Sequence, residues 1–340
     1  MAIRNIIYAM AAVLLSGLVA CSVDGPETGA LAEDKNTPHL TEDVLQGQLL
    51  VRFDARVSDI LEKAGVTKSG PMIPMTRSGI LSVDEILDLV EGYQIERVFP
   101  VDVRSEEKAR KEGLHLWYVV RFSEEYPVDK VAADLSRLGE VSRVEYNRTL
   151  KKASDDKPTP LTLERLKELT ANAVGGAFDD PLLSDQWHLV NNGNLRPTKF
   201  IKGADVNVEN AWEMTTGDPS IIVAVLDEGV DVSHPDLQAS MWVNEGEIWK
   251  SHEDNDGNGY AGDVHGYNFV SKHGVISTDS RYDTGHGTHV AGVIAAVNNN
   301  GTGISSIAGG NASQPGVKIM SCQIFSGQYA GTVLEEVRAI

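Results

Sequence analysis

The fold of this chain is decided by the stretch Asp283-Thr284-Gly285-His286-Gly287-Thr288-His289-Val290-Ala291-Gly292, read together with the stretch IIVAVLDEGVD at 221–231. In the second stretch, six apolar residues precede Asp227 and four of them are β-branched, which predicts a strand buried on both faces. In the first stretch, small and apolar residues follow His286, which predicts a helix packed closely on all sides. Open α/β sheets carry their chemistry at the carboxyl ends of the strands. We therefore expect His286 at a helix N-terminus, facing the strand end that carries Asp227.

Both stretches resemble the motifs of the subtilisin-like (subtilase) serine proteases. The aspartate motif of that family is similar to residues 223–229 and continues at 233–237, and the histidine motif is similar to residues 286–292. The resemblance implies an α/β fold with a doubly wound, mostly parallel sheet, of which this chain carries a part. It also implies a catalytic triad in the chain order Asp, His, Ser. In that triad Asp227 orients the imidazole, and His286 is the general base that takes the proton of a serine.

Each of these residues also has a plain structural interpretation. An Asp after a strand commonly forms a turn, and a His beside glycine commonly lies in a loop. Two long motifs in the family's order favour the catalytic interpretation. Glu228 departs from the family, which usually has Ser or Thr after the aspartate, and this puts the usual local hydrogen bonds around Asp227 in question.

The catalytic serine is not found in the sequence. No Gly-Thr-Ser-x-Ala motif follows His286, and the 54 residues after it are fewer than the family places between its histidine and its serine. We therefore expect a partial catalytic domain that is inactive as given, because loss of the serine removes nearly all turnover. The competing interpretation is a non-catalytic exported lipoprotein that uses a degenerate protease fold as a protein-binding module.

The N-terminal residues predict export and anchoring. The apolar run at 6–20 has 15 residues, which is short of the roughly 20 needed to span a bilayer, and it suits a signal peptide at 1–20. The end of this run, LVAC, resembles a bacterial lipoprotein box, which implies lipid modification of Cys21 and attachment to a membrane of the cell envelope. A plain signal peptide and a secreted protein are the alternative. The polar residues 21–46 predict a flexible tether.

Residues 47–150 predict a small α+β domain of the ferredoxin-like kind, because strand-like and helix-like patterns alternate along them. Subtilases keep an inhibitory folding prodomain in this position, so the resemblance implies an intramolecular inhibitor; an unrelated accessory domain is the alternative. Residues 151–179 predict a linker with a processing site, and 180–340 the N-terminal part of the catalytic domain. The expected strands are 49–53, 114–122, 141–146 and 317–325, and the expected helices are 57–64, 83–90, 128–138 and 208–212.

Residues 254–263, with the sequence DNDGNGYAGD, satisfy the first half of a calcium-loop pattern. Asp254, Asp256 and Asn258 offer oxygen atoms at alternating positions, but His265 stands where a bidentate Glu belongs, which excludes a full EF-hand. A structural calcium ion is one expectation, and an Asx-turn loop that bonds its own backbone is the other. No cofactor is expected for catalysis.

Residues 326–329, with the sequence SGQY, resemble the edge segment along which the family pairs a peptide substrate by strand addition. The resemblance implies that Ser326 and Gly327 contact the peptide and that Tyr329 stands near a subsite wall. An ordinary glycine turn is the alternative.

Composition limits the class of partner. The formal net charge of −19 argues against a nucleic-acid partner, which requires a basic face. A hydrophobic fraction of 41% in 340 residues supports cores for two domains. The two cysteines, Cys21 and Cys322, provide no intrachain disulfide framework. Proteins or peptides are therefore the expected substrates.

Overall fold

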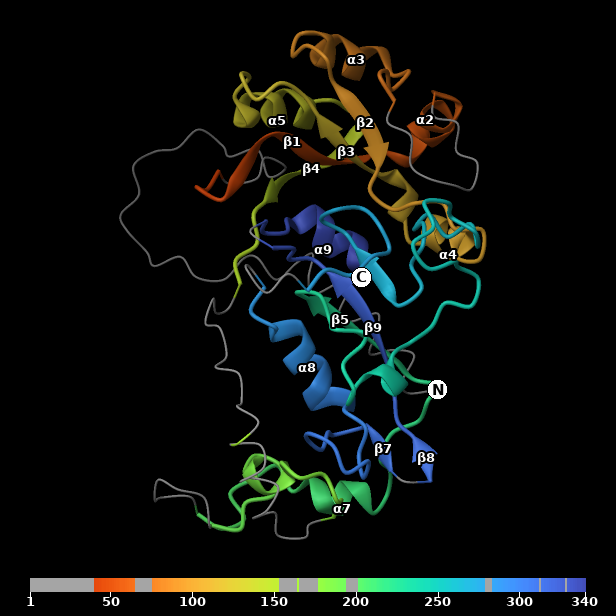
Figure 1. Ribbon diagram of the computed structural model, residues 1–340. Coiled ribbons are helices and arrows are strands. Elements are labelled where there is room, and N and C mark those ends of the chain that lie inside the picture. Colours follow the sequence, from red (N-terminus) through yellow and green to blue (C-terminus); the bar gives the residue numbers. More distant parts are fainter. Residues whose placement is uncertain are drawn as a thin grey trace, which may run out of the picture. The chain divides into compact units, whose positions relative to one another are not determined.

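The computed structural model describes residues 40–64, 75–152, 164, 177–193, 201–278, 283–311, 313–327 and 329–340. The predictions for the signal peptide, the lipidation of Cys21, most of the tether and most of the linker with its processing site lie outside these residues. Within the described ranges, no helix has the length and apolar character needed to cross a membrane. Two main sheets are present, an antiparallel one in the first half of the chain and a parallel one in the second half (Figure 1).

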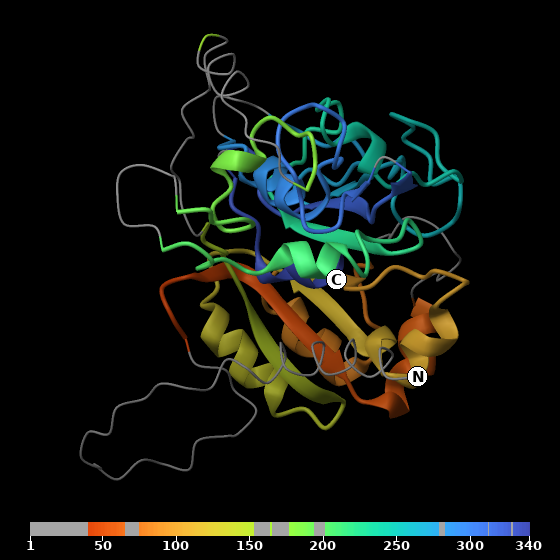
Figure 2. The same ribbon diagram turned by 90° about the horizontal axis from the view of Figure 1, so that it is seen from below.

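The first sheet has four antiparallel strands in the order β2-β3-β1-β4. Strand β1 lies between two partners, and Figure 2 shows it in red-orange beside the olive strand β4. Leu49, Val51 and Phe53 of β1 are fully buried on one face, while Leu50 is buried in a second cluster on the other face. Both faces of β1 are therefore covered. The strands are β1 (Val44–Phe53), β2 (Gln94–Arg97), β3 (Trp117–Arg121) and β4 (Val141–Arg148).

Helices α2, α3 and α5 supply the rest of this core. Their apolar residues are the ones that the helical spacing predicted. Val83 and Leu87 of α3 and Val131 and Leu135 of α5 are buried in one cluster with β1. The resulting order of strands and helices is that of a ferredoxin-like fold. The helices of this half are η1 (Ala55–Val57), α2 (Ser58–Ala64), α3 (Leu81–Asp88), α4 (Glu106–Lys111), η2 (Leu114–Leu116) and α5 (Val128–Ser136).

The second sheet is parallel, with the strand order β5-β9-β6. Val225 and Ile319 pack with residues of α8 on one face, and Cys322 packs with Ala339 of α9 on the other. The sheet therefore has helices on both faces, which confirms the doubly wound α/β class. Its elements are β5 (Ile222–Asp227), β6 (Gly266–Asn268), α8 (His286–Ala295), β9 (Lys318–Gln323) and α9 (Val333–Ala339). Smaller elements are η3 (Leu183–Asp185), α7 (Val208–Trp212), η4 (Gln238–Ser240), β7 (Gly310–Asn311) and β8 (Gln314–Pro315).

Two burial predictions are wrong. Strand β5 is not buried on both faces: Ile222 is 46% exposed and Ala224 is also exposed. The reason is that β5 is an edge strand, paired only with β9 among the described residues, and the apolar cover of its outer face reaches only Leu226. Helix α8 buries one face rather than all sides, since His289 on its surface is exposed.

Helix α9 contacts the first sheet as well as the second. Leu334 packs in one cluster with Leu50 of β1, and its backbone N–H donates to Asn147 Oδ1 at 3.0 Å. Arg338 Nη2 lies 2.7 Å from Glu96 Oε1, and both side chains are more than 90% buried. Glu96 also pairs with Arg121 at 3.0 Å, and Arg338 also donates to the carbonyl oxygens of Arg97 and Val98. Because removing one partner from a buried ion pair is costly, this network ties α9 to the first sheet.

The packing of α8 against the end of β5 depends on one glycine. A Cβ atom on Gly287 would lie 2.3 Å from the carbonyl oxygen of Glu228, whereas a Cβ atom on Gly292 would meet only Ile304 Cδ1, at 3.4 Å. We predict that Gly287→Ala lowers the free energy of unfolding by about 1–3 kcal/mol, because backbone must move to admit the methyl group. Chemical denaturation measures this. Gly292→Ala is the matched control and should be neutral or stabilising through helix propensity; equal effects of the two variants would contradict the close approach.

Candidate active site

The structure brings Asp227 and His286 into contact across 59 residues of sequence. Asp227 is the last residue of β5 and His286 is the first residue of α8. His286 Nδ1 lies 2.7 Å from Asp227 Oδ2 and 2.9 Å from Oδ1. An ionised carboxylate only accepts hydrogen bonds, so Nδ1 carries the proton and Nε2 of the neutral ring is free to act as a base. The imidazole is 46% exposed and the carboxylate 15% exposed, which leaves the ring accessible.

The turn into α8 orients this pair. Gly285 adopts φ +83° as the residue before the helix, a left-handed conformation that glycine reaches without strain. Thr288, one turn into the helix, accepts a hydrogen bond from the backbone N–H of Asp231 at 2.9 Å. The helix start is therefore tied to the loop that leaves β5.

Glu228 caps the same helix start with its side chain. Its Oε2 accepts hydrogen bonds from the backbone N–H groups of Thr284, Gly285 and His286 at 2.8, 3.0 and 3.2 Å, and from Thr284 Oγ1 at 3.0 Å. The side chain is 1% exposed, and its Oε1 lies 2.6 Å from Lys152 Nζ. Burial raises the pKa of this carboxyl, but the hydrogen bonds from Lys152 and Thr284 outweigh burial and hold the pKa below the ordinary 4.5.

Asp227 keeps a local hydrogen bond in spite of the departure at Glu228. The backbone N–H of Glu228 donates to Asp227 Oδ1 at 2.6 Å, so the group that fixes the carboxylate is main chain and does not depend on residue type. The Glu228 side chain instead accepts hydrogen bonds from the start of α8.

The residues expected to contact a peptide form a closed turn. Ser326 and Tyr329 pair with each other, with N···O distances of 3.1 and 3.0 Å. The N–H of Gly327, at φ +61°, donates to Asp283 Oδ1 at 3.0 Å. Tyr329 is 65% exposed. Their contact with a substrate stays a prediction, and the strand pairing nearby is made by a neighbouring segment.

That segment is Gly331–Thr332. Thr149 forms an antiparallel bridge with Thr332, and the N–H of Leu150 donates to the carbonyl oxygen of Gly331 at 2.8 Å. The chain leaving β4 thus extends by main-chain pairing toward the Asp227–His286 pair, two residues before Lys152 reaches Glu228.

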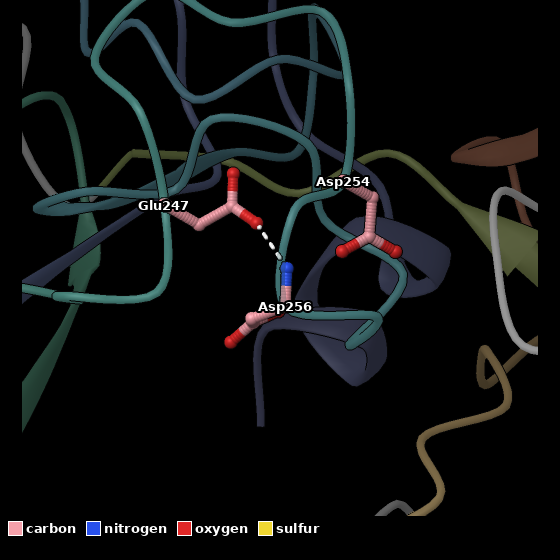
Figure 3. A group of neighbouring side chains, drawn as sticks. All are labelled: Glu247, Asp254 and Asp256. Atoms are coloured by element: carbon pink, nitrogen blue, oxygen red, sulfur yellow. Dashed lines mark hydrogen bonds between the residues drawn. The ribbon is translucent and has the colours of Figure 1, made fainter.

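Three carboxylates gather in the loop with the partial calcium pattern. Glu247, Asp254 and Asp256 each place one oxygen within 4.8 Å of the others (Figure 3). Oxygen ligands at about 2.3–2.6 Å from one calcium ion lie within about 5 Å of each other, so this donor set fits calcium. Asn258 bonds Asp254 and Asp256 through its backbone N–H, while its side chain has other partners: Nδ2 donates to Asp263 and Oδ1 accepts from the N–H of Tyr260. Glu247 was not predicted because it lies outside the loop motif.

The loop also bonds its own backbone. Asp254 accepts hydrogen bonds from the N–H groups of Gly257, Asn258 and Gly259, which is the Asx-turn arrangement. A carboxylate has about four acceptor positions, so these bonds leave capacity for an ion. Arg104 Nη1, 3.3 Å from Asp256 Oδ2, supplies one positive charge to the group. His265, at the twelfth position, contacts the Trp242 carbonyl through Nδ1 at 2.8 Å.

The second half of the chain thus has a doubly wound α/β sheet with a carboxylate–imidazole pair at its carboxyl edge. Residues 218–340 match the family model described as "Subtilase family". This part of the chain is therefore similar to the subtilase family.

Curated relatives share this region. The chain is 44% identical over 88 residues to Subtilisin-like protease 1 of Plasmodium vivax (26% of this chain, 13% of the relative). It is 32% identical over 161 residues to PC3-like endoprotease variant B of Hydra vulgaris (47% and 17%). It is also 36% identical over 103 residues to halolysin of Haloferax mediterranei (30% and 16%). The chain thus spans less than a fifth of the length of each of these relatives.

Solved structures with partial similarity include fervidolysin from Fervidobacterium pennivorans, described as a keratinolytic enzyme related to subtilisin. It is 20% identical with a TM-score of 0.42, over 87% of this chain and 32% of that chain. The Aeromonas sobria serine protease in its complex with a chaperone is 27% identical with a TM-score of 0.31, over 42% of this chain and 20% of that chain.

The Glu228 cap predicts a dependence of stability on pH. Because its pKa in the folded chain lies below 4.5, the ionised carboxylate stabilises the fold above pH 4.5, and this contribution is lost as pH falls through the lowered pKa. We predict that Glu228→Gln lowers the free energy of unfolding by about 1.5–3 kcal/mol at pH 7, as expected for hydrogen bonds to a charged group.

Urea unfolding of the wild type and of Glu228→Gln between pH 7 and pH 3 measures the difference in their free energies of unfolding. The difference should shrink toward the acid end of the range. Glu85→Gln, at an exposed position on α3, is the control and should show no such trend. A Glu228→Gln deficit that stays constant to pH 3 would show that the carboxylate charge is not the cause.

Proposed function

We propose that this chain belongs to an exported subtilisin-like serine endopeptidase precursor and carries two members of its catalytic triad, Asp227 as the residue that orients the imidazole and His286 as the general base. The observation that carries the proposal is the Asp227–His286 contact at 2.7 Å at the junction of β5 and α8. The match of residues 218–340 to the subtilase family model supports it. The nucleophile of the proposed triad is a serine in a Gly-Thr-Ser-x-Ala motif, and this motif does not occur among residues 287–340.

The two residues divide the proton chemistry. Nε2 of His286 takes the proton of the serine hydroxyl as the serine oxygen bonds to the peptide carbonyl carbon, and then gives that proton to the leaving amine. Asp227 holds the ring in the tautomer with the proton on Nδ1 and stabilises the imidazolium that forms. Water then repeats the sequence on the acyl-enzyme and releases the second product.

The first-sheet domain, residues 40–150 with β1 to β4, is proposed as the inhibitory and folding prodomain. Its support is the buried contact with α9, through the Glu96–Arg338 ion pair at 2.7 Å and the Asn147 cap. Further support is the pairing of Leu150 with Gly331. A segment held in this way occupies main-chain positions beside the catalytic pair that a substrate peptide would need.

Fluorophosphonate labelling of the complete gene product, read past Ile340, tests both roles. We expect labelling of the protein after cleavage within the linker at 151–179, and suppression of labelling when purified residues 40–152 are added back. His286→Ala should lower turnover by about 10⁶-fold and Asp227→Asn by about 10⁴-fold, whereas the control His252→Ala, at an exposed position, should leave it unchanged.

Two outcomes would contradict these proposals separately. A gene that encodes no serine motif beyond Ile340, or a complete protein that takes no label, would favour the non-catalytic binding module. Labelling that residues 40–152 do not suppress would remove the inhibitory role and leave the peptidase in place.

We also propose that Glu247, Asp254 and Asp256 hold a structural calcium ion. The support is the mutual approach of their oxygens within 4.8 Å and the all-oxygen donor set that calcium prefers. Such an ion would fix the loop 247–263 and take no part in the proton transfers.

We predict that millimolar calcium raises the thermal midpoint of the chain and that EGTA lowers it. Calcium at 100 times its dissociation constant stabilises by about 2.7 kcal/mol, which corresponds to a few degrees for a chain of this size. Differential scanning calorimetry measures the shift. Asp254→Asn or Glu247→Gln should abolish it, and Asp218→Asn, in an exposed turn, should not. A wild-type thermal midpoint that does not change with calcium would contradict the ion site and leave the Asx-turn loop that bonds its own backbone.

A further inference from the structure

The ion pair between Lys152 and Glu228 lies next to the candidate catalytic pair and plays no part in the proposed proton transfers. Lys152 Nζ is 2.6 Å from Glu228 Oε1, and the two side chains are 16% and 1% exposed. The ammonium group also lies over the ring of Phe325, 5.9 Å from its centroid. A carboxylate and an aromatic face are the two groups that recognise a cation in proteins. The groups around the Lys152 ammonium therefore suit a positive charge.

The carboxylate of this site is fixed in place. Oε2 of Glu228 is held by the first turn of α8, where it accepts from the N–H of His286 at 3.2 Å and from two preceding N–H groups. Oε1 is left to face Lys152. The carboxylate thus needs no rearrangement to accept a cation, and preorganised groups bind with a smaller entropic cost.

The residues that precede Lys152 pair through their main chain, as a bound peptide would. Thr149 and Leu150 pair with Thr332 and Gly331 through main-chain atoms, and main-chain pairing of this kind gives affinity without sequence preference. Preference comes from the pockets that receive side chains. Among residues 149–152 of this segment, Lys152 pairs its side chain with the carboxylate of Glu228, which also accepts from the N–H of His286.

We propose that Glu228 and Phe325 form a subsite for a lysine or arginine side chain of a bound peptide, and that Lys152 occupies this subsite in cis. The inference rests on the proposed peptidase function, since it names the class of substrate: peptides with a basic residue close to the bond that is cut. Glu228 is buried and adjacent to Asp227 in sequence, so a peptide without a positive charge at this position leaves Oε1 of the carboxylate without a cationic partner, which is unfavourable.

Hydrogen exchange in the 340-residue chain tests the site without requiring activity. The readout is the amide of Leu150, which donates to Gly331. We expect Lys152→Arg to keep this amide as protected as in the wild type. Lys152→Met, which preserves the length of the side chain and removes the charge, should exchange at least about tenfold faster because a charge-assisted hydrogen bond is lost. Glu228→Gln should behave like Lys152→Met.

Peptide hydrolysis by the complete protein is the second readout. In a peptide series that varies one position at a time among Lys, Arg, Met and Glu, one position should favour Lys or Arg over Met by at least about tenfold in kcat/KM. Glu228→Gln should erase this preference. Hydrolysis with no basic preference would overturn the subsite while the peptidase stands. If no peptide is cut, the proposed function fails, and the exchange experiment decides the subsite alone: equal protection in Lys152→Met and Lys152→Arg overturns it.

Discussion

A buried carboxylate at the first turn of α8 is the constraint on which the candidate site depends. One oxygen of Glu228 accepts hydrogen bonds from three consecutive backbone N–H groups, the last of them that of His286. These groups have no partner inside the helix, and they form the positive end of its dipole. A negative charge placed there stabilises the helix start and sets the position from which the His286 ring reaches Asp227. The residue that fixes the geometry of the Asp227–His286 pair is therefore Glu228, which follows Asp227 in the sequence.

Two neighbouring acids in the sequence serve different partners because of where β5 ends. Asp227 is the last strand residue and directs its carboxylate to the imidazole, while Glu228 is fully enclosed and serves the backbone of α8 and Lys152. A single buried carboxylate that met both the ring and the helix start would have to divide its acceptor positions. With two acids, the part-exposed Asp227 bonds the imidazole, and the buried Glu228 bonds the start of α8.

Much of this arrangement could be predicted from the sequence because motifs report local structure. The strand before Asp227, the helix after His286 and the helix at 208–212 follow from short-range patterns, and the ends of a parallel strand and a following helix meet by topology. The partner of Glu228 could not be predicted, since Lys152 lies 76 residues away in a segment without periodicity. Strand β2 was missed because Glu96 and Arg97 are buried by ion pairing, which an apolar pattern does not reveal. The exposure of Ile222 depends on the neighbours of β5, which a run of apolar residues does not specify.

The burial of Cys322 between the parallel sheet and α9 has a chemical consequence. Its surroundings raise the pKa of the thiol to about 12, chiefly through burial, so almost no thiolate exists at neutral pH. The thiolate is the form that oxidants and disulfides attack. For as long as α9 remains packed on the sheet, Cys322 is therefore protected from forming mixed disulfides, including in the oxidising compartment that the proposed export would take the chain through.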